Sequence, residues 1–345
     1  MQVGIVGHFG NGLNLLNGQT IKTKIVAAEL ERVFGKDDVW KIDTHGGLKL
    51  FFKLPLLLFL VLLKCKNVII MPAQNGLLVI PPLLYVLNFV FKRKIHYVVV
   101  GGWMPNLILK RPFLTHCLKR LDQICVETSV VKETLEDRHF FNVKIMRNCK
   151  PLQITPICEL RKSHDNVFRL CLFSRVMKQK GIEHAVAAIA KMSERFGKES
   201  CCLDIYGQVE YSEMEWFNKL QESFPDNVTY KGVVPFDKSV SVLKDYSALL
   251  FPTLFYTEGV PGTIIDAYAA GLPVISSRWA SFSDVIEDGK TGFGYEFGSF
   301  EQLCVLLENL MSSPENLNGM RVDCVEKAKY FLPENAMKNF IDGMR

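Results

Sequence analysis

Short apolar runs rich in Val and Ile alternate with longer helical patterns along this chain, and the alternation restricts its fold more than any other feature. Such runs are typical of parallel strands buried on both faces, and the longer stretches are typical of the helices that connect them. In the first half the pattern predicts a helix at about Gly18–Phe34 and strands at Gln2–Gly7, Val39–Ile42, Asn67–Met71, Ile95–Val100, Gln123–Val126 and Lys144–Met146.

The pattern restarts in the second half, after an irregular stretch at 148–166. It predicts strands at Phe168–Phe173, Cys201–Tyr206, Val228–Gly232, Ala248–Phe251 and Pro273–Ser276. A chain of 345 residues is long enough for two domains. We therefore expect an α/β protein of two doubly wound, Rossmann-like domains that face each other across a cleft. The expected divisions are a first domain at 1–150, a linker at 151–166, a second domain at 167–330 and a C-terminal helix at 331–345 that returns to the first domain.

The charged residues divide unevenly between the two halves. Residues 1–150 contain 21 Lys/Arg and 10 Asp/Glu, whereas residues 151–345 contain 20 and 26, so a net charge of only +5 combines a basic half with an acidic half. The 78 residues from Thr44 to Leu121, which we call the acid-free segment, contain 11 Lys/Arg and no Asp or Glu. These cations flank long aliphatic runs and are not interleaved with aromatic residues, which argues against nucleic acid as a partner.

Two apolar runs lie within the acid-free segment. Leu54–Leu63 is too short to span a bilayer, which takes about twenty apolar residues, and Gly76–Phe91 is interrupted by Pro81-Pro82. We expect both runs to form helices packed on a sheet, with part of the surface of residues 49–94 lying against the anionic inner face of a membrane. The N-terminus lacks a signal-peptide pattern and the ten cysteines are scattered, so we expect free thiols and a cytoplasmic, peripheral-membrane location.

The stretch Phe251–Val274 combines a strand end, a Gly/Pro turn and a helix start. The helix is expected to begin near Gly262-Thr263, where amides without internal partners and the helix dipole favour a bound phosphate. Glu258 lies just before this helix and Asp266 one turn into it. Because a carboxylate accepts two hydroxyl hydrogen bonds at once, this pair suits the vicinal diols of a sugar or a ribose.

A second polar turn, at 174–181, follows the strand at Phe168–Phe173. Arg175 offers a fixed fork of donors, and Lys180 offers a flexible point charge. Two cations at the carboxyl edge of the same sheet are suited to hold a diphosphate whose negative charge increases as it leaves.

Together these residues resemble the signature of retaining glycosyltransferases of family 4, which have the GT-B fold. The resemblance covers about residues 168–310, and the glycine loop after the first strand extends it to the N-terminus. It rests on Arg175 and Lys180, on Glu258-Gly259-Val260-Pro261, and on Asp266-Ala267 with Ala270-Gly271-Leu272-Pro273-Val274.

The resemblance implies a retaining, metal-independent hexosyltransferase without a cofactor. It would move a sugar from a nucleotide-diphosphate sugar to a glycan or lipid-linked acceptor, in the synthesis of bacterial surface polysaccharide or glycolipid. Arg175 and Lys180 would neutralise the diphosphate, and the leaving phosphate would help to deprotonate the acceptor on the same face. Glu258, the third member of the catalytic set, would bind hydroxyls of the transferred sugar, and Asp266 would bind those of the ribose. The remaining donor contacts would come from Gly10, Gly12, Gly259, Val260, Pro261, Gly262 and Thr263.

The sequence departs from this family at two points. The family usually has Glu where Asp266 stands, and the shorter side chain loosens or shifts the expected ribose contact. The family often has a histidine after the fourth strand of the first domain, where this chain reads Val100-Gly101-Gly102-Trp103. His96 lies at the other end of that strand and is expected to be structural, which leaves His8 or His45 as candidates for a polar group near the reacting carbon.

Three alternatives compete with this interpretation. A Rossmann-type oxidoreductase needs a Gly-x-Gly-x-x-Gly loop, which is not in register here, and an acid on the ribose, for which Asp43 is the best residue. A two-domain sugar-binding protein without catalysis closes over its ligand with the same architecture. A nucleotide-sugar epimerase on this fold needs proton-transfer carboxylates and histidines, which the motifs do not specify.

Overall fold

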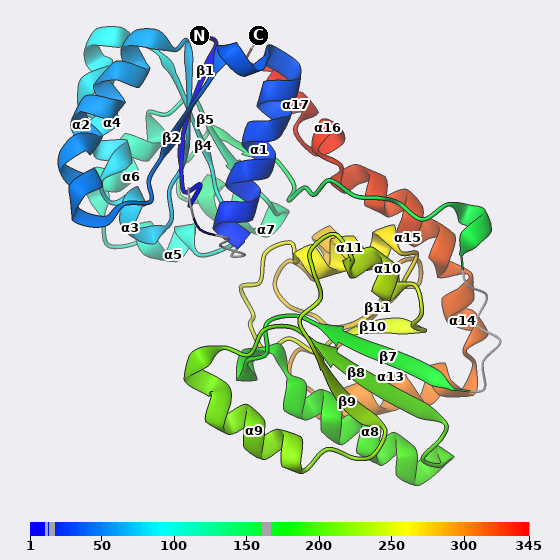
Figure 1. Cartoon of the computed structure of the whole chain (residues 1–345). Helices are drawn as coiled ribbons and strands as arrows, with labels where there is room; N and C mark the ends of the chain where they lie inside the picture. The colour runs from blue at the N-terminus through cyan, green and yellow to red at the C-terminus, as the bar shows by residue number, and fades with distance from the viewer. Residues whose placement is uncertain (11–12, 14–17, 161–166, 345) are drawn as a thin grey trace. The chain divides into compact units, whose positions relative to one another are not determined.

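The computed structural model describes residues 1–10, 13, 18–160 and 167–344, with the side chains of 47–49 and 51 not described (Figure 1). The chain divides into two compact units. The first comprises Met1–Pro151 with Phe331–Arg345, and the second comprises Leu152–Tyr330. Residues 152–160, which we expected in the linker, thus belong to the second unit, where the Thr155 N–H donates to the Ala269 carbonyl oxygen at 2.8 Å. Residues 161–166 of the expected linker lie outside the described residues.

The first unit contains a six-stranded parallel sheet with the strand order β2-β1-β3-β4-β5-β6. Val3 in β1 lies opposite Val39 in β2 and Asn67 in β3. Both β1 and β3 are buried along their whole length, as their unbroken apolar sequences predict. The strands are β1 (Val3–Gly7), β2 (Val39–Asp43), β3 (Asn67–Met71), β4 (Lys94–Val98), β5 (Gln123–Val126) and β6 (Val143–Ile145).

Helices cover both faces of this sheet, with α2, α4 and α6 on one face and α1 and α17 on the other (Figure 1). At Gly4 in β1 a side chain would meet a Val61 methyl group at 2.2 Å, so the glycine lets α2 pack closely on the strand. The helices are α1 (Gly18–Phe34), α2 (Gly47–Lys64), α3 (Gln74–Leu77), α4 (Ile80–Phe91), α5 (Met104–Ile108), α6 (Pro112–Lys119), α7 (Ser129–Glu136), α16 (Pro333–Ala336) and α17 (Lys338–Asp342).

The C-terminal segment packs on the first unit and completes its core. The Asn67 side chain donates to the Met344 carbonyl oxygen at 3.3 Å, and the Lys150 N–H donates to the Phe331 carbonyl oxygen at 2.9 Å. Phe340 is buried in the same apolar cluster as β1 and α1. The face of the sheet under α17 is therefore covered by residues distant in sequence from its strands.

The second unit contains another six-stranded parallel sheet, with the order β12-β11-β10-β7-β8-β9. Five strands match the predicted positions, and β12, which no apolar run announces, pairs with β11. The strands are β7 (Phe168–Phe173), β8 (Cys201–Tyr206), β9 (Val228–Gly232), β10 (Ala248–Phe251), β11 (Val274–Ser277) and β12 (Gly292–Tyr295). The helices are α8 (Ile182–Phe196), α9 (Met214–Glu222), α10 (Ser239–Leu243), α11 (Gly262–Ala269), α12 (Phe282–Val285), α13 (Phe300–Ser312), α14 (Glu315–Asn318) and α15 (Met320–Ala328).

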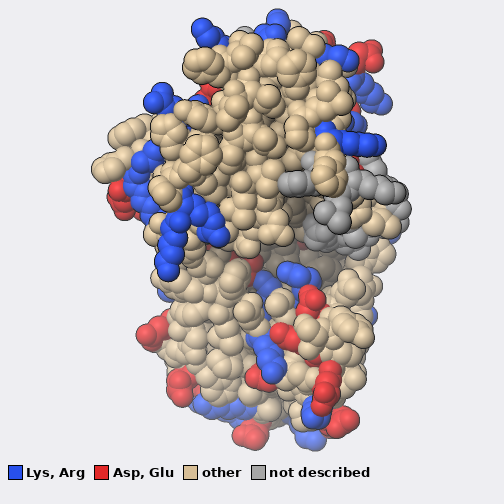
Figure 2. Space-filling model, turned by 90° about the vertical axis from the view of Figure 1, so that its left-hand side faces the viewer, with Lys and Arg blue, Asp and Glu red and all other residues tan. Residues whose placement is uncertain are grey.

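The two apolar runs of the acid-free segment form helices that bury only one side. In α2 the side chains of Leu54, Leu58 and Leu62 are buried, whereas Phe52 and Leu56 are exposed. Among the described residues, the segment Gln74–Phe91 has the length and hydropathy of a membrane-spanning helix, with 22% of it buried. This segment is divided into α3 and α4, and Pro81 and Pro82 stand in the first turn of α4. Figure 2 faces this side of the first unit and shows a broad surface of uncharged residues with Lys and Arg around it.

Candidate functional site

The order of the second sheet changes direction between the neighbouring strands β7 and β10. From β7 the chain continues to β8 and β9 on one side, and β10, β11 and β12 lie on the other. Loops that leave two neighbouring strands in opposite directions leave room for a ligand between them. The loops concerned are 174–181 after β7 and 252–261 after β10, and the Leu254 N–H donates to the Gln179 carbonyl oxygen at 2.8 Å to join them.

Lys180 and Glu258 meet at this point, one from each loop. The Lys180 Nζ lies 2.6 Å from the Glu258 Oε2, and the side chains are 14% and 16% exposed. The Thr253 hydroxyl lies 3.4 Å from the same carboxylate oxygen, and the Lys180 ammonium lies 5.6 Å from the centre of the Phe251 ring. The predicted cation and carboxylate therefore form one nearly buried ion pair at the end of the two central strands.

Gly181 explains how the two loops come so close. Its φ is +70°, and a side chain at this position would place its Cβ 1.9 Å from the Pro252 carbonyl oxygen. A residue with a side chain would therefore be strained and would also push the loops apart. Because Gly181 has no side chain, the backbone of the loop after β10 can approach closely, and this brings Glu258 within reach of the neighbouring Lys180.

Arg175 is placed differently from Lys180. Its guanidinium is 68% exposed, and Nη1 lies 3.2 Å from the Glu210 carboxylate, beyond the end of β8. The described contacts therefore bring Lys180 and Glu258 together but join Arg175 to Glu210. Glu210 was not among the predicted site residues, although it follows a strand whose carboxyl end lies at the same edge.

The Gly/Pro turn after β10 leads into α11 as its sequence predicts. Pro261 is the residue before the helix, and the amides of Gly262 and Thr263 have no possible partner inside it because they are its first two. The Thr263 hydroxyl is buried and has no hydrogen-bond partner among the described residues. A buried hydroxyl beside the first amides of a helix is suited to bind a polar ligand. In the sequence, the only sign of this role is the position of Thr263 in the predicted first turn of the helix.

Asp266 and the turn residues before α11 differ in accessibility. Asp266 is 4% exposed and lies one turn into α11, whereas Gly259 is partly exposed and Val260 is 5% exposed. Asp266 is thus largely closed to solvent, whereas Gly262 at the start of α11 is exposed.

The first unit places a second polar group at the carboxyl ends of β1 and β2. His8 Nε2 lies 3.0 Å from His45 Nδ1, and His8 Nδ1 lies 2.8 Å from the Thr20 hydroxyl. We call these the His8–His45 pair. Asp43 Oδ1 accepts from the amides of Phe9, Gly10 and His45, so this carboxylate holds the glycine loop. Gly10 has a φ of +61°, and the predicted donor residue Gly12 lies outside the described residues.

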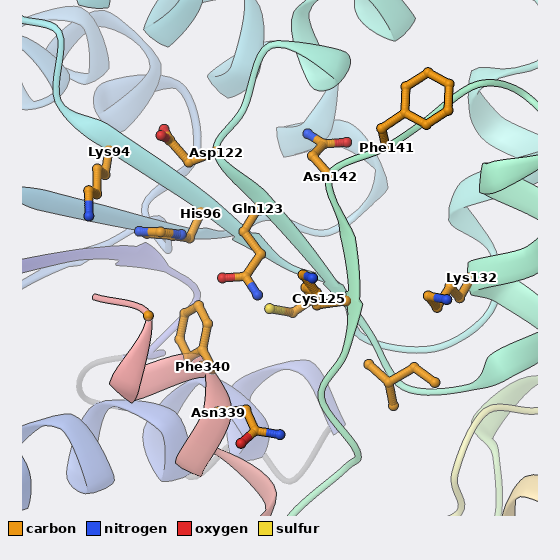
Figure 3. A pocket seen from close by; sticks show the side chains of 13 residues that line it. Lys94, His96, Asp122, Gln123, Cys125, Lys132, Phe141, Asn142, Asn339 and Phe340 are labelled. Atoms are coloured by element: carbon orange, nitrogen blue, oxygen red, sulfur yellow. The ribbon is translucent and has the colours of Figure 1, made fainter. Parts of the chain in front are cut away.

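His96 lies away from the carboxyl edge, on the sheet face beside α17 (Figure 3). Its Nε2 lies 3.2 Å from Asn67 Oδ1, and its ring packs edge-on against Phe340 at 5.6 Å. Burial lowers the pKa of His96 to about 4, and burial raises the pKa of the neighbouring Cys125 thiol to about 12. Both groups are therefore uncharged at neutral pH, which fits the structural role expected for His96.

An open cavity of about 760 Å³ lies beside His96, over the amino ends of β4 and β5 (Figure 3). Its lining includes Lys94, Asp122, Gln123 and Asn339. Within residues 1–10, 13, 18–160 and 167–344, no group of His, Cys, Asp and Glu side chains is arranged to hold a metal ion.

Comparison with known proteins gives a likeness to one family. Residues 168–313 match the family model described as Glycosyl transferases group 1. The amylovoran biosynthesis glycosyltransferase AmsK of Erwinia amylovora is 25% identical over 159 residues, which are 44% of this chain and 38% of that protein. An uncharacterized glycosyltransferase of Methanocaldococcus jannaschii is 27% identical over 172 residues, 46% of this chain and 40% of that protein. The matches thus span about two fifths of each relative.

Comparison with solved structures shows the fold. The crystal structure of Anabaena HepE in complex with UDP and glucose has a TM-score of 0.75 at 13% identity, and 100% of this chain and 99% of that chain are covered. The predicted fold class, GT-B with two doubly wound α/β domains, is confirmed by this likeness and by the two parallel sheets. Family and fold together support a glycosyltransferase, and favour it over a sugar-binding protein or an epimerase.

Proposed function

We propose that this chain is a retaining glycosyltransferase of family 4 that transfers a sugar from a nucleotide-diphosphate sugar to a glycan or lipid-linked acceptor, in surface polysaccharide or glycolipid synthesis on the cytoplasmic side. The observation that carries the proposal is the Lys180–Glu258 pair at the carboxyl ends of β7 and β10. The cation suits the anionic diphosphate of the donor, and the carboxylate suits the hydroxyl groups of its sugar.

The proposed roles follow from where each group lies. Lys180 neutralises the charge that develops on the leaving diphosphate, and Glu258 accepts hydrogen bonds from hydroxyls of the transferred sugar. The first amides of α11 and the unpartnered Thr263 hydroxyl bind the phosphates. The exposed guanidinium of Arg175 is available to the diphosphate once it leaves Glu210.

Asp266 is proposed to bind the ribose, and Gly10 and Gly12 of the first unit to approach the diphosphate. Asp266 lies one turn into α11, close in sequence to the amides proposed to bind the phosphates, and this placement supports the proposed contact. Gly10 lacks a side chain and adopts a φ of +61°, which lets backbone approach a ligand closely. Glu258 and Asp266 stand eight residues apart, as the two acidic residues of the family signature do.

Retention and independence from metal are further parts of the proposal. In the proposed reaction the acceptor hydroxyl attacks the anomeric carbon on the face that the diphosphate leaves, the leaving phosphate oxygen takes the hydroxyl proton, and Lys180 stabilises the departing charge. The His8–His45 pair is the candidate polar group of the first unit near the reacting carbon. If the mechanism is correct, chelation of divalent ions leaves the rate unchanged and the product keeps the anomeric configuration of the donor.

A donor screen followed by a transfer assay tests the proposal. HepE was solved with UDP and glucose, so UDP-sugars are the first members of a panel that also includes GDP-, ADP- and dTDP-sugars. We expect one donor to raise the melting temperature and its labelled sugar to enter lipid or glycan of a membrane extract.

The assay includes variants that separate chemistry from folding. Glu258→Ala and Lys180→Ala should each abolish transfer in a folded protein, whereas Lys198→Ala, a surface lysine 80% exposed in the same unit, should not. Near-normal transfer by either site variant contradicts the assignment of the site. Interconversion of the donor sugar without transfer contradicts the proposed function and supports an epimerase.

A further inference from the structure

One exposed face of α2 carries large apolar side chains, with the exposed Lys53 and Lys64 beside it. Its large side chains recur at intervals of four, three and four residues, which places them on one face of a helix. The exposed fractions are 78%, 62%, 41% and 50% for Phe52, Leu56, Phe59 and Leu63. The opposite side of α2 is buried in the core, so the helix presents one apolar face to the core and another to solvent.

Two neighbouring helices extend this apolar surface. In α4, Val86, Phe89 and Val90 are 64%, 86% and 77% exposed, and in α6, Phe113 is 59% exposed. Ring contacts join the three helices, at 5.2 Å between Phe59 and Phe91 and at 6.5 Å between Tyr85 and Phe113. We call the continuous surface the α2–α4–α6 face. Monomeric proteins rarely leave so many large apolar side chains together in water unless something covers them.

Cations predominate at the ends of these three helices, although the exposed Asp122 follows Arg120 by two residues. All three belong to crossovers between parallel strands, so they run in the same direction and their carboxyl ends lie at one edge of the face. The exposed cations at that edge are Lys64, Lys66, Lys92, Lys94, Lys119 and Arg120, and Lys53, Lys110 and Arg111 lie nearer the other edge. In Figure 2 blue side chains accordingly lie around the uncharged surface of this unit.

We propose that the α2–α4–α6 face docks on the surface of an anionic lipid bilayer, with Phe52, Phe89 and Val90 entering the boundary between headgroups and acyl chains. Such a surface offers apolar depth for the aromatic side chains and negative charge for the surrounding cations. A second copy of this chain is a poor occupant, because a symmetric contact would oppose two rims in which cations outnumber the acidic Asp122.

The face lies on the bilayer and does not span it. The helix α4 contains 12 residues, which at about 1.5 Å per residue extend far less than the roughly 30 Å of a hydrocarbon core. Ile80, Pro81 and Leu84 of α4 are buried in the core of the first unit, so the helix cannot leave the sheet without exposing them. The bilayer is thus met by one side of each helix.

This docking also indicates the acceptor class, an inference that rests on the proposed function. The helix α2 begins two residues after His45, so the His8–His45 pair lies at the start of the membrane-facing helix. Phe52 follows Gly47 by five residues, or roughly 8 Å along the helix axis. A sugar carried on a lipid phosphate would therefore reach the carboxyl edge of the first sheet from the headgroup layer, so the acceptor is lipid-linked.

Vesicle flotation with the full chain tests the docking. The vesicles contain equal parts phosphatidylglycerol and phosphatidylcholine, with phosphatidylcholine alone for comparison. Wild-type protein should float with the anionic vesicles at about 0.05 M salt and much less at about 0.5 M, because salt screens the cations. Phe89→Glu should weaken vesicle binding by at least about tenfold, since it replaces an inserted ring by a charge. Phe141→Glu is the matched control, because Phe141 is 89% exposed in the same unit but lies outside the face.

The flotation and sedimentation results separate docking on lipid from the alternatives. Flotation that is lost in Phe89→Glu and kept in Phe141→Glu supports the proposal. Wild-type protein that stays at the bottom with anionic vesicles at low salt, or equal binding by the two variants, overturns it. A dimer in sedimentation velocity that Phe89→Glu dissociates would show that a second copy covers the face. Vesicle binding without any transfer would overturn the proposed function alone, whereas transfer to a soluble glycan without vesicle binding would overturn the docking alone.

Discussion

The Lys180–Glu258 pair is expected to stabilise the second unit as well as to bind the donor, and a double-mutant cycle measures this. With exposures of 14% and 16%, the pair lies between exposed pairs, worth about 0.2–1 kcal/mol, and fully buried ones, whose disruption costs about 3–5 kcal/mol. Lys180→Met and Glu258→Gln should each lower the free energy of unfolding by about 2 kcal/mol, because each leaves one group without its partner. The double variant should lose less than the sum, which gives an interaction energy of about 1–2 kcal/mol.

The measurement has to follow the second unit alone, because a chain of two units need not unfold in one step. Two of the four tryptophans, Trp40 and Trp103, belong to the first unit. With both replaced by Phe, urea unfolding followed by tryptophan fluorescence reports on the second unit through Trp216 and Trp279. A loss of about 2 kcal/mol should also lower the melting temperature of this unit by roughly 4–8 °C.

A matched pair in the same unit gives the control. Lys198 and Asp226 lie 3.2 Å apart but are 80% and 88% exposed, so their interaction energy should not exceed about 0.5 kcal/mol. An equally small interaction energy for Lys180 and Glu258 would refute the reasoning, since it would mean that burial adds nothing to the attraction. A small interaction energy would also show that the ion pair is not the contact that holds the two loops together.

Three further predictions concern the packing and titration of single groups. Gly181→Ala should cost at least about 2 kcal/mol of stability in urea unfolding because of the 1.9 Å approach to Pro252, whereas Gly298→Ala, with a φ of +76° and no atom within 4 Å, should cost about 1 kcal/mol; equal costs contradict the close approach of the loops. Burial lowers the pKa of His96 from 6.5 to about 4, so the unfolded chain binds more protons between these values and the first unit should lose about 3 kcal/mol as the pH falls from 7 to 4. His96→Gln should remove that part of the pH dependence, and a His96 titration by NMR near 6.5 would disprove it. Cys158 is exposed, Cys202 is partly exposed and the other eight cysteines are buried. One thiol should therefore react rapidly with Ellman's reagent, and Cys158→Ser should abolish that phase; more than two reactive thiols in the folded protein would contradict the burial of the eight.

The strands were predictable where the chain buries both faces of the sheet. The runs at β1, β3 and β7 need apolar side chains at nearly every position, and such runs are visible in the sequence. The strand β12 was missed because Gly292 and Gly294 weaken any strand pattern. Its position depends on β11, since a side chain at Gly292 would meet the Val274 carbonyl oxygen at 2.1 Å. Tertiary packing thus decides what the local sequence does not.

The site was predictable in its position more than in its contacts. The place of Lys180 and Glu258 follows from the rule that parallel strands end at one edge, and their roles toward a donor stay predictions. That Thr253 lies beside Glu258, and that Arg175 turns to Glu210, depends on loop geometry and on contacts across 35 residues of sequence. The acid-free segment likewise predicted basic, apolar helices, but only the structure separates the buried side of α2 from its exposed side.

The return of residues 331–344 to the first unit imposes an order on folding during synthesis. These residues leave the ribosome only after the whole of the second unit, yet Phe340 covers His96 and the Met344 carbonyl oxygen binds Asn67, 277 residues earlier. The first unit is therefore begun before the second unit and completed after it. The part of its sheet face under α17 stays uncovered while about 180 further residues are added, a delay of roughly 10–40 s at usual rates of synthesis. During that interval the first unit has an incomplete core. The packing of residues 331–344 onto its sheet is therefore the folding step at which misfolding is most expected.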